Sequence, residues 1–176
     1  DPIFISGSFN EIEVELAIQY TKGSEEKIRS YVNNINTVDG GTHLTGLRMA
    51  LTKSINDYIK KYDLLASGKK KKNDEIQIIG KDTREGLVGV LSIKVREPQF
   101  EGQTKAKLGN EEAQEAVNHV VKDKLSEYFD MLSGAGFLVS NLKEPKPTEE
   151  GLEKHPEYFK GNLRIPQSVI IEALKI

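Results

Sequence analysis

The chain has 176 residues, of which 37% are hydrophobic and 30% are charged, so it is long enough for one good core and a small appendage. A formal net charge of -2 argues against binding of nucleic acid through overall charge, and no apolar run reaches the length of a membrane span. The sequence has no cysteine, which excludes disulfides and thiolate chemistry and fits a cytoplasmic protein.

The three histidines do not suggest a metal site, and the first residues suggest that the chain is part of a longer protein. His43, His119 and His155 are far apart in the sequence and lack metal-ligand spacing, so we expect no metal site. No secretory signal pattern is present. Residues 1–5 begin almost inside an extended apolar segment without an initiating Met. We therefore expect a fragment of a longer polypeptide rather than a processed terminus.

An alternating pattern predicts a strand over residues 11–20. Polar residues separate its apolar members over most of the run, and these members are Ile12, Val14, Leu16, Ile18 and Tyr20. This pattern is typical of a half-buried strand with an acidic outer face. A turn at residues 23–24 leads to a second candidate strand over residues 27–35, and the short connection predicts an antiparallel hairpin.

A first long helix is expected to begin after Gly40 and Gly41, which permit unusual backbone dihedrals. Thr42 follows these glycines and can cap the helix. Apolar residues then recur at helical spacing on one face, so the helix should run to about Tyr62. We interpret His43 as a capping or hydrogen-bonded structural residue rather than a catalyst.

Four successive lysines follow this helix, at Lys69, Lys70, Lys71 and Lys72. Their mutual repulsion predicts an extended, solvated loop. The functional alternative is a set of contacts with DNA phosphates, because each neutralised phosphate adds salt-dependent affinity. The residues alone leave both interpretations open.

The middle of the chain predicts another strand and another helix. Residues 76–79 form either a short strand or the end of a loop. A turn with Asp82 as its cap leads to a strand over residues 88–95. A second long helix should open near Asn110, with two acids in its first turn where the helix dipole favours them. Strands and helices in this order predict an α+β layered fold.

The last part of the chain differs in character. Residues 133–136 interrupt the second helix, and residues 144–148 indicate a stiff linker. Residues 168–176 could form a short amphipathic helix or a strand. We expect the apolar residues of this tail to pack on the sheet or to extend it.

The loop between the strand at 88–95 and the second helix carries the residues best suited to binding a phosphate. Gly102 lets the backbone approach a ligand closely. Gln103 can donate through its amide, and Lys105 offers a positive charge with three donors, which suits a terminal phosphate. The alternative is a solvated turn of polar residues.

Four motifs, in this order and at these spacings, resemble the transducer domain of bacterial DNA gyrase B subunits. They are NNINT at 33–37, DGGTHLTG at 39–46, DTREGL at 82–87 and FEGQTK at 100–105. The topoisomerase IV B subunit is similar, and these motifs do not separate the two. The resemblance runs from about residue 2 to residue 129. It implies a transducer domain at 1–129 and a C-terminal extension or linker, outside the family pattern, at 130–176.

The resemblance implies a fold like the second domain of ribosomal protein S5, a mixed β-sheet with two long helices packed on one face. In this family the transducer lies between an ATP-binding domain and a metal-binding domain that shares in DNA cleavage. By position, Gln103 and Lys105 would contact the γ-phosphate of ATP in the preceding domain. Lys105 would take the catalytic role, and Thr104 would support the loop. The domain would couple ATP binding and hydrolysis to DNA strand passage.

The resemblance also implies cofactors and partners. ATP and Mg2+ would be used by the full-length protein, and none is expected on this fragment, because the family's ATP-binding motifs lie upstream. The fragment alone is predicted to be inactive. Its partners would be double-stranded DNA and the DNA gyrase A protein in an A2B2 heterotetramer, with a homodimer contact through the upstream domain and no membrane.

A DNA contact along the first helix is a further hypothesis, and two other function classes compete with the leading one. Arg48, Lys53 and the lysine run at 69–72 could line a cavity that holds the transported duplex. The competing classes are a nucleic-acid-binding S5-like module and the middle domain of another ATP-gated dimer, such as a mismatch-repair protein. Near-neutral charge speaks against the first, and the segment at 40–43 favours gyrase over the second.

Overall fold

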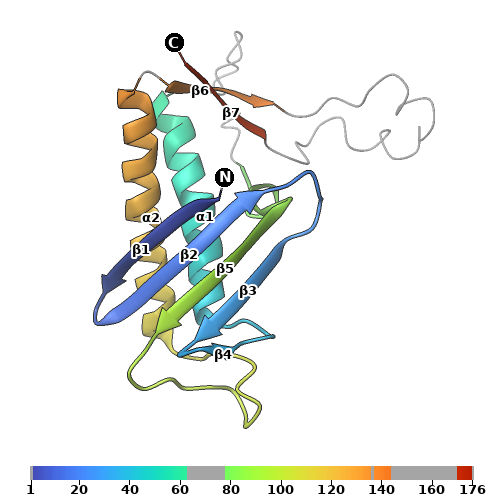
Figure 1. Ribbon diagram of the computed structural model, residues 1–176, viewed down its shortest axis with the longest axis vertical. Coiled ribbons are helices and arrows are strands. Elements are labelled where there is room, and N and C mark those ends of the chain that lie inside the picture. The colour runs from blue at the N-terminus through green and yellow to red at the C-terminus, as the bar shows by residue number, and fades with distance from the viewer. Residues whose placement is uncertain (1, 63–77, 136, 144–169, 176) are drawn as a thin grey trace, which may run out of the picture.

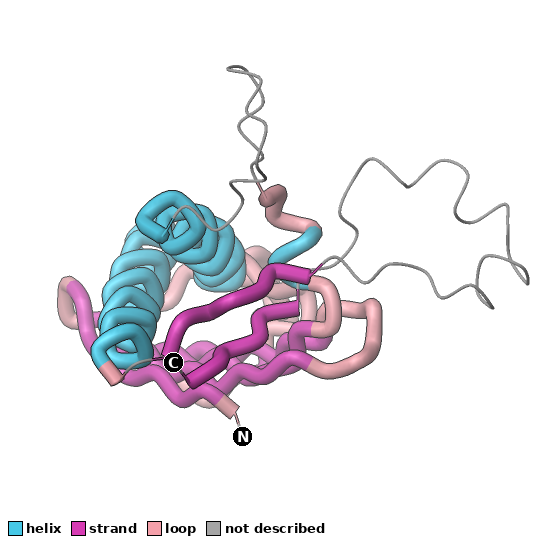
Figure 2. The backbone as a smooth tube through the Cα atoms, turned by 90° about the horizontal axis from the view of Figure 1, so that it is seen from above, coloured by secondary structure: helices cyan, strands magenta, loops and turns pink. Residues whose placement is uncertain are grey.

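The computed structural model describes residues 2–62, 78–135, 137–143 and 170–175, and it shows a mixed sheet with two long helices (Figure 1). The elements follow one another as β1 (Ile3–Phe9), β2 (Ile12–Tyr20), β3 (Lys27–Val32), β4 (Ile35–Asn36), α1 (Thr42–Tyr62), the 3-10 turn η1 (Asp82–Arg84), β5 (Leu87–Lys94), α2 (Glu111–Gly134), β6 (Phe137–Lys143) and β7 (Ile170–Lys175). Both helices lie on the same side of the sheet, as the view in Figure 2 shows. The expected α+β layers are therefore present.

The five-stranded sheet has the order β1-β2-β5-β3-β4, and β5 occupies its centre. It pairs antiparallel with β2 and parallel with β3. The sequence predicts that the strands at 11–20 and 27–35, which are β2 and β3, pair as a hairpin. This prediction is wrong, because β5 lies between them. A short connection favours direct pairing, but β5 has one charge in eight residues, whereas β3 carries Lys27 and Arg29. The more apolar strand takes the central position of the sheet.

Two tight hairpins set the register at the edges of the sheet. Asn10 and Glu11 join β1 to β2, and Asn33 and Asn34 join β3 to β4. All four residues have positive φ, between 47° and 66°. Two central residues with positive φ define the turn whose twist matches that of paired strands, and asparagine tolerates this conformation well. The NNINT motif therefore contains a hairpin turn, and β3 ends at residue 32 instead of 35.

The core lies between the sheet and the two helices. The alternation predicted for residues 11–20 is confirmed as far as Ile18, since the inward side chains of β2 are buried to that point and Glu13 and Glu15 are exposed. Tyr20, the last apolar residue of the predicted pattern, is exposed. The largest fully buried apolar side chains are Leu16, Leu47, Leu87, Leu91, Ile93, Leu108, Val14, Val32, Val117 and Val121. The helices approach closely at Gly46, where an added Cβ would collide with the carbonyl oxygen of Gln114.

The second half of the chain agrees with the predictions in part. The strand at 87–94 and the helices at 42–62 and 111–134 lie where the patterns placed them. Asp82, however, does not cap the turn that follows it; its carboxylate accepts a hydrogen bond from the preceding Ile79 N–H at 3.1 Å. The helix α2 continues to Gly134, past the boundary proposed at residue 129.

The C-terminal strands form a sheet of their own. The strands β6 and β7 pair antiparallel with each other, so the tail does not extend the main sheet, and residues 170–175 are a strand rather than a helix. The lysine run at 69–72 lies outside the described residues, as do residues 76 and 77. Within the parts of the chain that are described, neither helix is long and apolar enough to cross a membrane.

His43 is buried at the start of α1 and is only half satisfied. Its Nε2 lies 3.1 Å from the Thr37 hydroxyl, which in turn bonds the hydroxyl of Ser30 at 2.7 Å. Its Nδ1 is buried and has no hydrogen-bond partner among the described residues. The structural role expected for His43 is thus supported by one bond, to Thr37 after β4, and the Thr37 hydroxyl links it in turn to Ser30 of β3.

We predict that His43 makes stability depend on pH in acid. Burial lowers the pKa of His43 from 6.5 to about 4, so the unfolded chain takes up a proton at a higher pH than the folded protein does. The free energy of unfolding should therefore fall as pH drops from about 6.5 to about 4, by on the order of 3 kcal/mol from this group. An NMR titration of the imidazole should show it neutral down to about pH 5. A protonation midpoint near 6.5 in the folded protein would contradict the assignment.

Candidate functional site

The candidate phosphate-binding loop is an exposed tip on a paired neck, within the 95–110 connection at the lower end of the molecule in Figure 1. Two contacts between Glu101 and Lys107 close its neck. The Glu101 N–H donates to the Lys107 carbonyl at 2.8 Å, and the two side chains form an ion pair at 3.1 Å. Phe100 and Leu108 form a bridge below the neck. Backbone pairing therefore holds both ends of the loop.

The tip carries all three residues that the sequence singled out. Gln103, Thr104 and Lys105 are exposed, and their side chains form no hydrogen bond or ion pair with any described part of the chain. Lys105 has a φ of 53° and Gly102 a φ of 80°. A left-handed backbone costs a residue with a side chain about 1–2 kcal/mol. The neck holds Lys105 in this conformation, which leaves its ammonium group available to a ligand from outside the chain.

The neck is joined to the first residues of α1 by a second set of backbone hydrogen bonds, which we call the Gly41–Leu108 junction. The Leu108 N–H donates to the Gly40 carbonyl at 3.1 Å, and the Thr42 N–H donates to the Leu108 carbonyl at 3.1 Å. The Asp39 N–H donates to the Ala106 carbonyl at 2.9 Å. The junction therefore consists of residues 39–42 paired with residues 106–108.

Gly41 makes this close approach of two backbones possible. It has a φ of 135°, and an added Cβ would lie 2.5 Å from the Leu108 nitrogen and closer still to its carbonyl oxygen. Leu108 is fully buried, which fixes the other side of the junction in the core. The glycine is needed here for space as well as for its backbone conformation.

The start of α1 is capped by this junction and not by Thr42. The Thr42 hydroxyl is buried and has no hydrogen-bond partner among the described residues, so the predicted side-chain cap is wrong. Instead, the Leu108 carbonyl accepts the Thr42 N–H, one of the four donors that a helix start leaves free. A backbone group from a distant segment thus replaces the side chain that local sequence suggested.

Asn110 ties the other end of the loop to α2, a role that sequence reasoning missed. Its side-chain oxygen accepts the Gln99 N–H at 2.6 Å, and its amide nitrogen donates to the Glu97 carbonyl at 3.1 Å. The same amide donates to Glu112 at 2.6 Å, and this hydrogen bond lowers the pKa of the Glu112 carboxyl. Asparagine before a helix is a capping signal, but this side chain accepts no backbone N–H from α2, and two of its three partners precede it in the chain.

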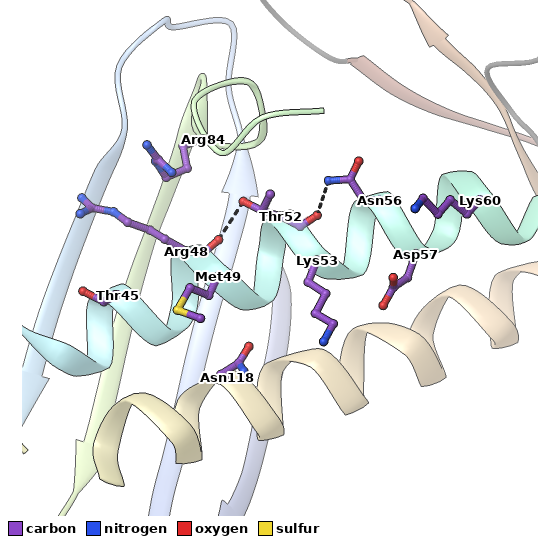
Figure 3. A pocket seen from close by; sticks show the side chains of 10 residues that line it. All are labelled: Thr45, Arg48, Met49, Thr52, Lys53, Asn56, Asp57, Lys60, Arg84 and Asn118. Carbon is purple, nitrogen blue, oxygen red and sulfur yellow. Dashed lines mark hydrogen bonds between the residues drawn. The ribbon is translucent and has the colours of Figure 1, made fainter. Parts of the chain in front are cut away.

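A second polar region lies along the middle of α1, away from the loop tip. A pocket of about 590 Å3 is lined by the helix, by Arg84 from η1 and by Asn118 from α2 (Figure 3). Arg48 and Lys53, which the sequence suggested as DNA contacts, both lie in it. The structure therefore separates the candidate residues into two groups, the loop tip and this pocket.

Metal ligands do not cluster in the part of the chain that the structure describes. No three His, Asp or Glu side chains among the described residues lie close enough together to hold a metal ion. We therefore assign no metal site to these residues.

We predict that Gly41→Ala opens the Gly41–Leu108 junction. Its methyl group would meet the Leu108 backbone, so the Leu108 and Thr42 amides should exchange hydrogen at least about tenfold faster, as expected for the loss of one or two backbone hydrogen bonds. Gly102→Ala is the matched control, since it also places a side chain at a positive φ but its Cβ meets no atom within 4 Å, so it should leave these two amides protected. Unchanged protection of these amides in Gly41→Ala would show that the junction does not need the glycine.

Comparisons with known sequences agree on one family. A family model described as DNA gyrase B matches residues 1–145. The DNA gyrase B subunit of Treponema denticola is 44% identical over 153 residues, which cover 87% of this chain and 22% of that protein. The DNA gyrase B subunit of Enterococcus faecalis is 50% identical over 130 residues, which cover 73% of this chain and 18% of that protein. The chain spans about a fifth of the length of these curated relatives.

Two solved structures that match this fold come from a gyrase B protein and from a topoisomerase IV. The ATPase domain of Thermus thermophilus gyrase B, bound to an aminocoumarin, matches with a TM-score of 0.66 and 40% identity over 76% of this chain and 34% of that chain. The ATP-binding domain of topoisomerase IV from Francisella tularensis, in complex with a small-molecule inhibitor, matches with a TM-score of 0.62 and 32% identity over 74% of this chain and 34% of that chain. With most of its length matched in both sequence and fold, the chain belongs to the DNA gyrase B family.

Proposed function

We propose that residues 1–129 are the transducer module of the ATPase subunit of a type II DNA topoisomerase of the gyrase class, with a fold like the second domain of ribosomal protein S5. Residues 130–176 are an extension outside this module. Family membership supports the proposal, since the related proteins are DNA gyrase B subunits. The observation that carries it is the exposed tip with Lys105, held on a neck whose backbone is paired with the start of α1.

The loop tip reads the terminal phosphate of ATP bound in a preceding domain, which uses ATP with Mg2+. Gln103 donates an amide hydrogen to the γ-phosphate, Lys105 places its ammonium against it, and Thr104 supports the turn between them. A charge-assisted hydrogen bond of this kind contributes about 1.5–3 kcal/mol. Lys105 loses this contact when the γ-phosphate leaves, so the loop binds the triphosphate state and releases the diphosphate state. Such differential binding is what shifts a two-state equilibrium.

The Gly41–Leu108 junction transmits the position of the loop to α1. Three backbone hydrogen bonds connect the neck with residues 39–42, and α1 begins within this junction. A displacement of the neck therefore moves the start of a helix of 21 residues, or breaks several hydrogen bonds together. Movement of α1 with the neck is what couples nucleotide state to the opening and closing of a DNA gate.

The basic side chains along α1 face the DNA that the enzyme transports. Arg48 and Lys53 line the pocket in Figure 3, and the lysine run at 69–72 adds further contacts to phosphates. The partners are double-stranded DNA and the DNA gyrase A protein in an A2B2 heterotetramer in the cytoplasm, with a homodimer contact through the ATP-binding domain. The isolated chain is expected not to hydrolyse ATP, because Lys105 completes a site in another domain.

We predict that Lys105→Ala, made in the full-length protein, abolishes most ATP turnover while DNA binding is largely kept. The loss of a charge-assisted contact to the γ-phosphate should lower the rate of ATP turnover by about tenfold to a hundredfold. Supercoiling should fall with it, because each strand passage depends on the nucleotide state. Steady-state ATPase and supercoiling assays, with DNA binding measured in parallel, test this.

The control for this experiment is Lys124→Ala, which removes a half-exposed lysine of α2 that pairs, among the described residues, only with Glu127. It should turn over ATP at the rate of the unaltered protein. Normal ATP turnover in Lys105→Ala would refute the assignment of the loop. A loss of DNA binding equal to the loss of turnover would instead place Lys105 on DNA.

A further inference from the structure

One carboxylate, Glu26, holds two arginines from different parts of the chain. It lies in the connection between β2 and β3. The Arg48 Nε donates to Glu26 Oε1 at 2.9 Å, and the Arg48 Nη2 donates to Glu26 Oε2 at 3.1 Å. The Arg84 Nε forms an ion pair with Glu26 Oε2 at 3.2 Å. Three segments that are distant in the sequence therefore meet at one negative charge.

The contact between Arg48 and Glu26 has the geometry with which arginine binds a phosphate. Two parallel N–H groups of the guanidinium fork meet two oxygens, as in an arginine–phosphate pair. The Glu26 side chain is 19% exposed, whereas the Arg48 side chain is 42% exposed. The carboxylate is thus more buried than the arginine, and part of the Arg48 side chain is open to solvent.

The charges at this point do not balance. Glu26 neutralises one of the two arginines, which leaves a net charge of about +1 on the three side chains. Both arginines line the pocket in Figure 3, together with Lys53. A phosphate that approached this pocket would meet the Arg48 fork, which Glu26 already occupies with both oxygens, and Arg84, which the same carboxylate holds by a single contact.

We propose that Glu26 is a built-in counter-ion that occupies the phosphate-binding edge of Arg48, and holds Arg84 beside it by one contact, until a DNA phosphate replaces it. The inference rests on the proposed function, in which α1 faces DNA. Carboxylate and phosphate compete for the same guanidinium fork, so the free energy gained with the phosphate is largely offset by the loss of the contact with Glu26. DNA binding at this point therefore stays weak enough to be reversible. Glu26 therefore limits the affinity for DNA during transport.

The test compares Glu26→Gln with Glu25→Gln in the full-length protein, using a short mixed-sequence DNA duplex and a series of salt concentrations. Both variants remove one negative charge from the same connection. Within the described part of the chain, however, Glu25 pairs only with Lys27, and both of those side chains are largely exposed. Glu26→Gln should bind DNA about tenfold more tightly at low salt, with a salt slope steeper by about one, because each cation that is freed can neutralise one more phosphate. Glu25→Gln should bind about as tightly as the unaltered protein.

Three results would overturn the inference. They are an unchanged or weaker affinity in Glu26→Gln, an equal gain in Glu25→Gln, and a gain in Glu26→Gln that persists when Arg48 and Arg84 are both replaced by Gln. Thermal unfolding of each variant is measured in parallel. If Glu26→Gln does not fold, Glu26→Asp serves instead. It keeps the net charge but has a shorter reach, so a gain in affinity would still support release of the arginines, and no gain would contradict it.

The arginine variants separate this inference from the proposed function. If Arg48→Gln and Arg84→Gln leave both affinity and salt slope unchanged, α1 does not face DNA, and the proposed DNA contact and the role of Glu26 fail together. If these variants weaken binding while Glu26→Gln does not strengthen it, α1 faces DNA and Glu26 is only a structural anchor.

Discussion

The backbone pairing at the Gly41–Leu108 junction is the constraint on which the rest of the molecule depends. It caps α1 and joins the neck of the loop to the start of that helix through main-chain groups, beside the fully buried Leu108 side chain. Main-chain hydrogen bonds have fixed geometry, so the loop tip cannot shift far without moving α1 or breaking the junction. A side chain at position 41 would separate the two backbones, which gives the double glycine in the DGGTH motif a physical reason.

The helix α1 connects the two groups of candidate residues. Its first residues belong to the junction, and its middle lines the pocket that contains Arg48 and Lys53. Close packing against α2 at Gly46 lies between them, so a shift at one end of α1 changes the packing of both helices. In this account the loop senses the nucleotide, α1 carries the movement, and the arginines held by Glu26 meet the DNA.

Much of the local structure could be predicted from the sequence, whereas the contacts that build the sites could not. The alternation in β2 and the apolar stripes of α1 and α2 depend on neighbours within a few residues, and so does the exposed loop with Gln103. The insertion of β5, the capping of α1 by Leu108 and the pairing of Glu26 with Arg84 join residues far apart in the chain. Local propensity carries no information on such pairs, which is why a distant carbonyl fulfils the role that local sequence predicts for Thr42.

The phosphate-reading role of Lys105 is tested most directly by the affinities of a non-hydrolysable ATP analogue and of ADP, measured by calorimetry for the full-length protein and for its Lys105→Ala variant. If Lys105 contacts only the γ-phosphate, the variant should lose about tenfold to a hundredfold in affinity for the analogue and keep its affinity for ADP. The preference for triphosphate would then shrink by the same factor. An equal loss for both nucleotides, or no loss for either, would contradict a loop that senses the terminal phosphate.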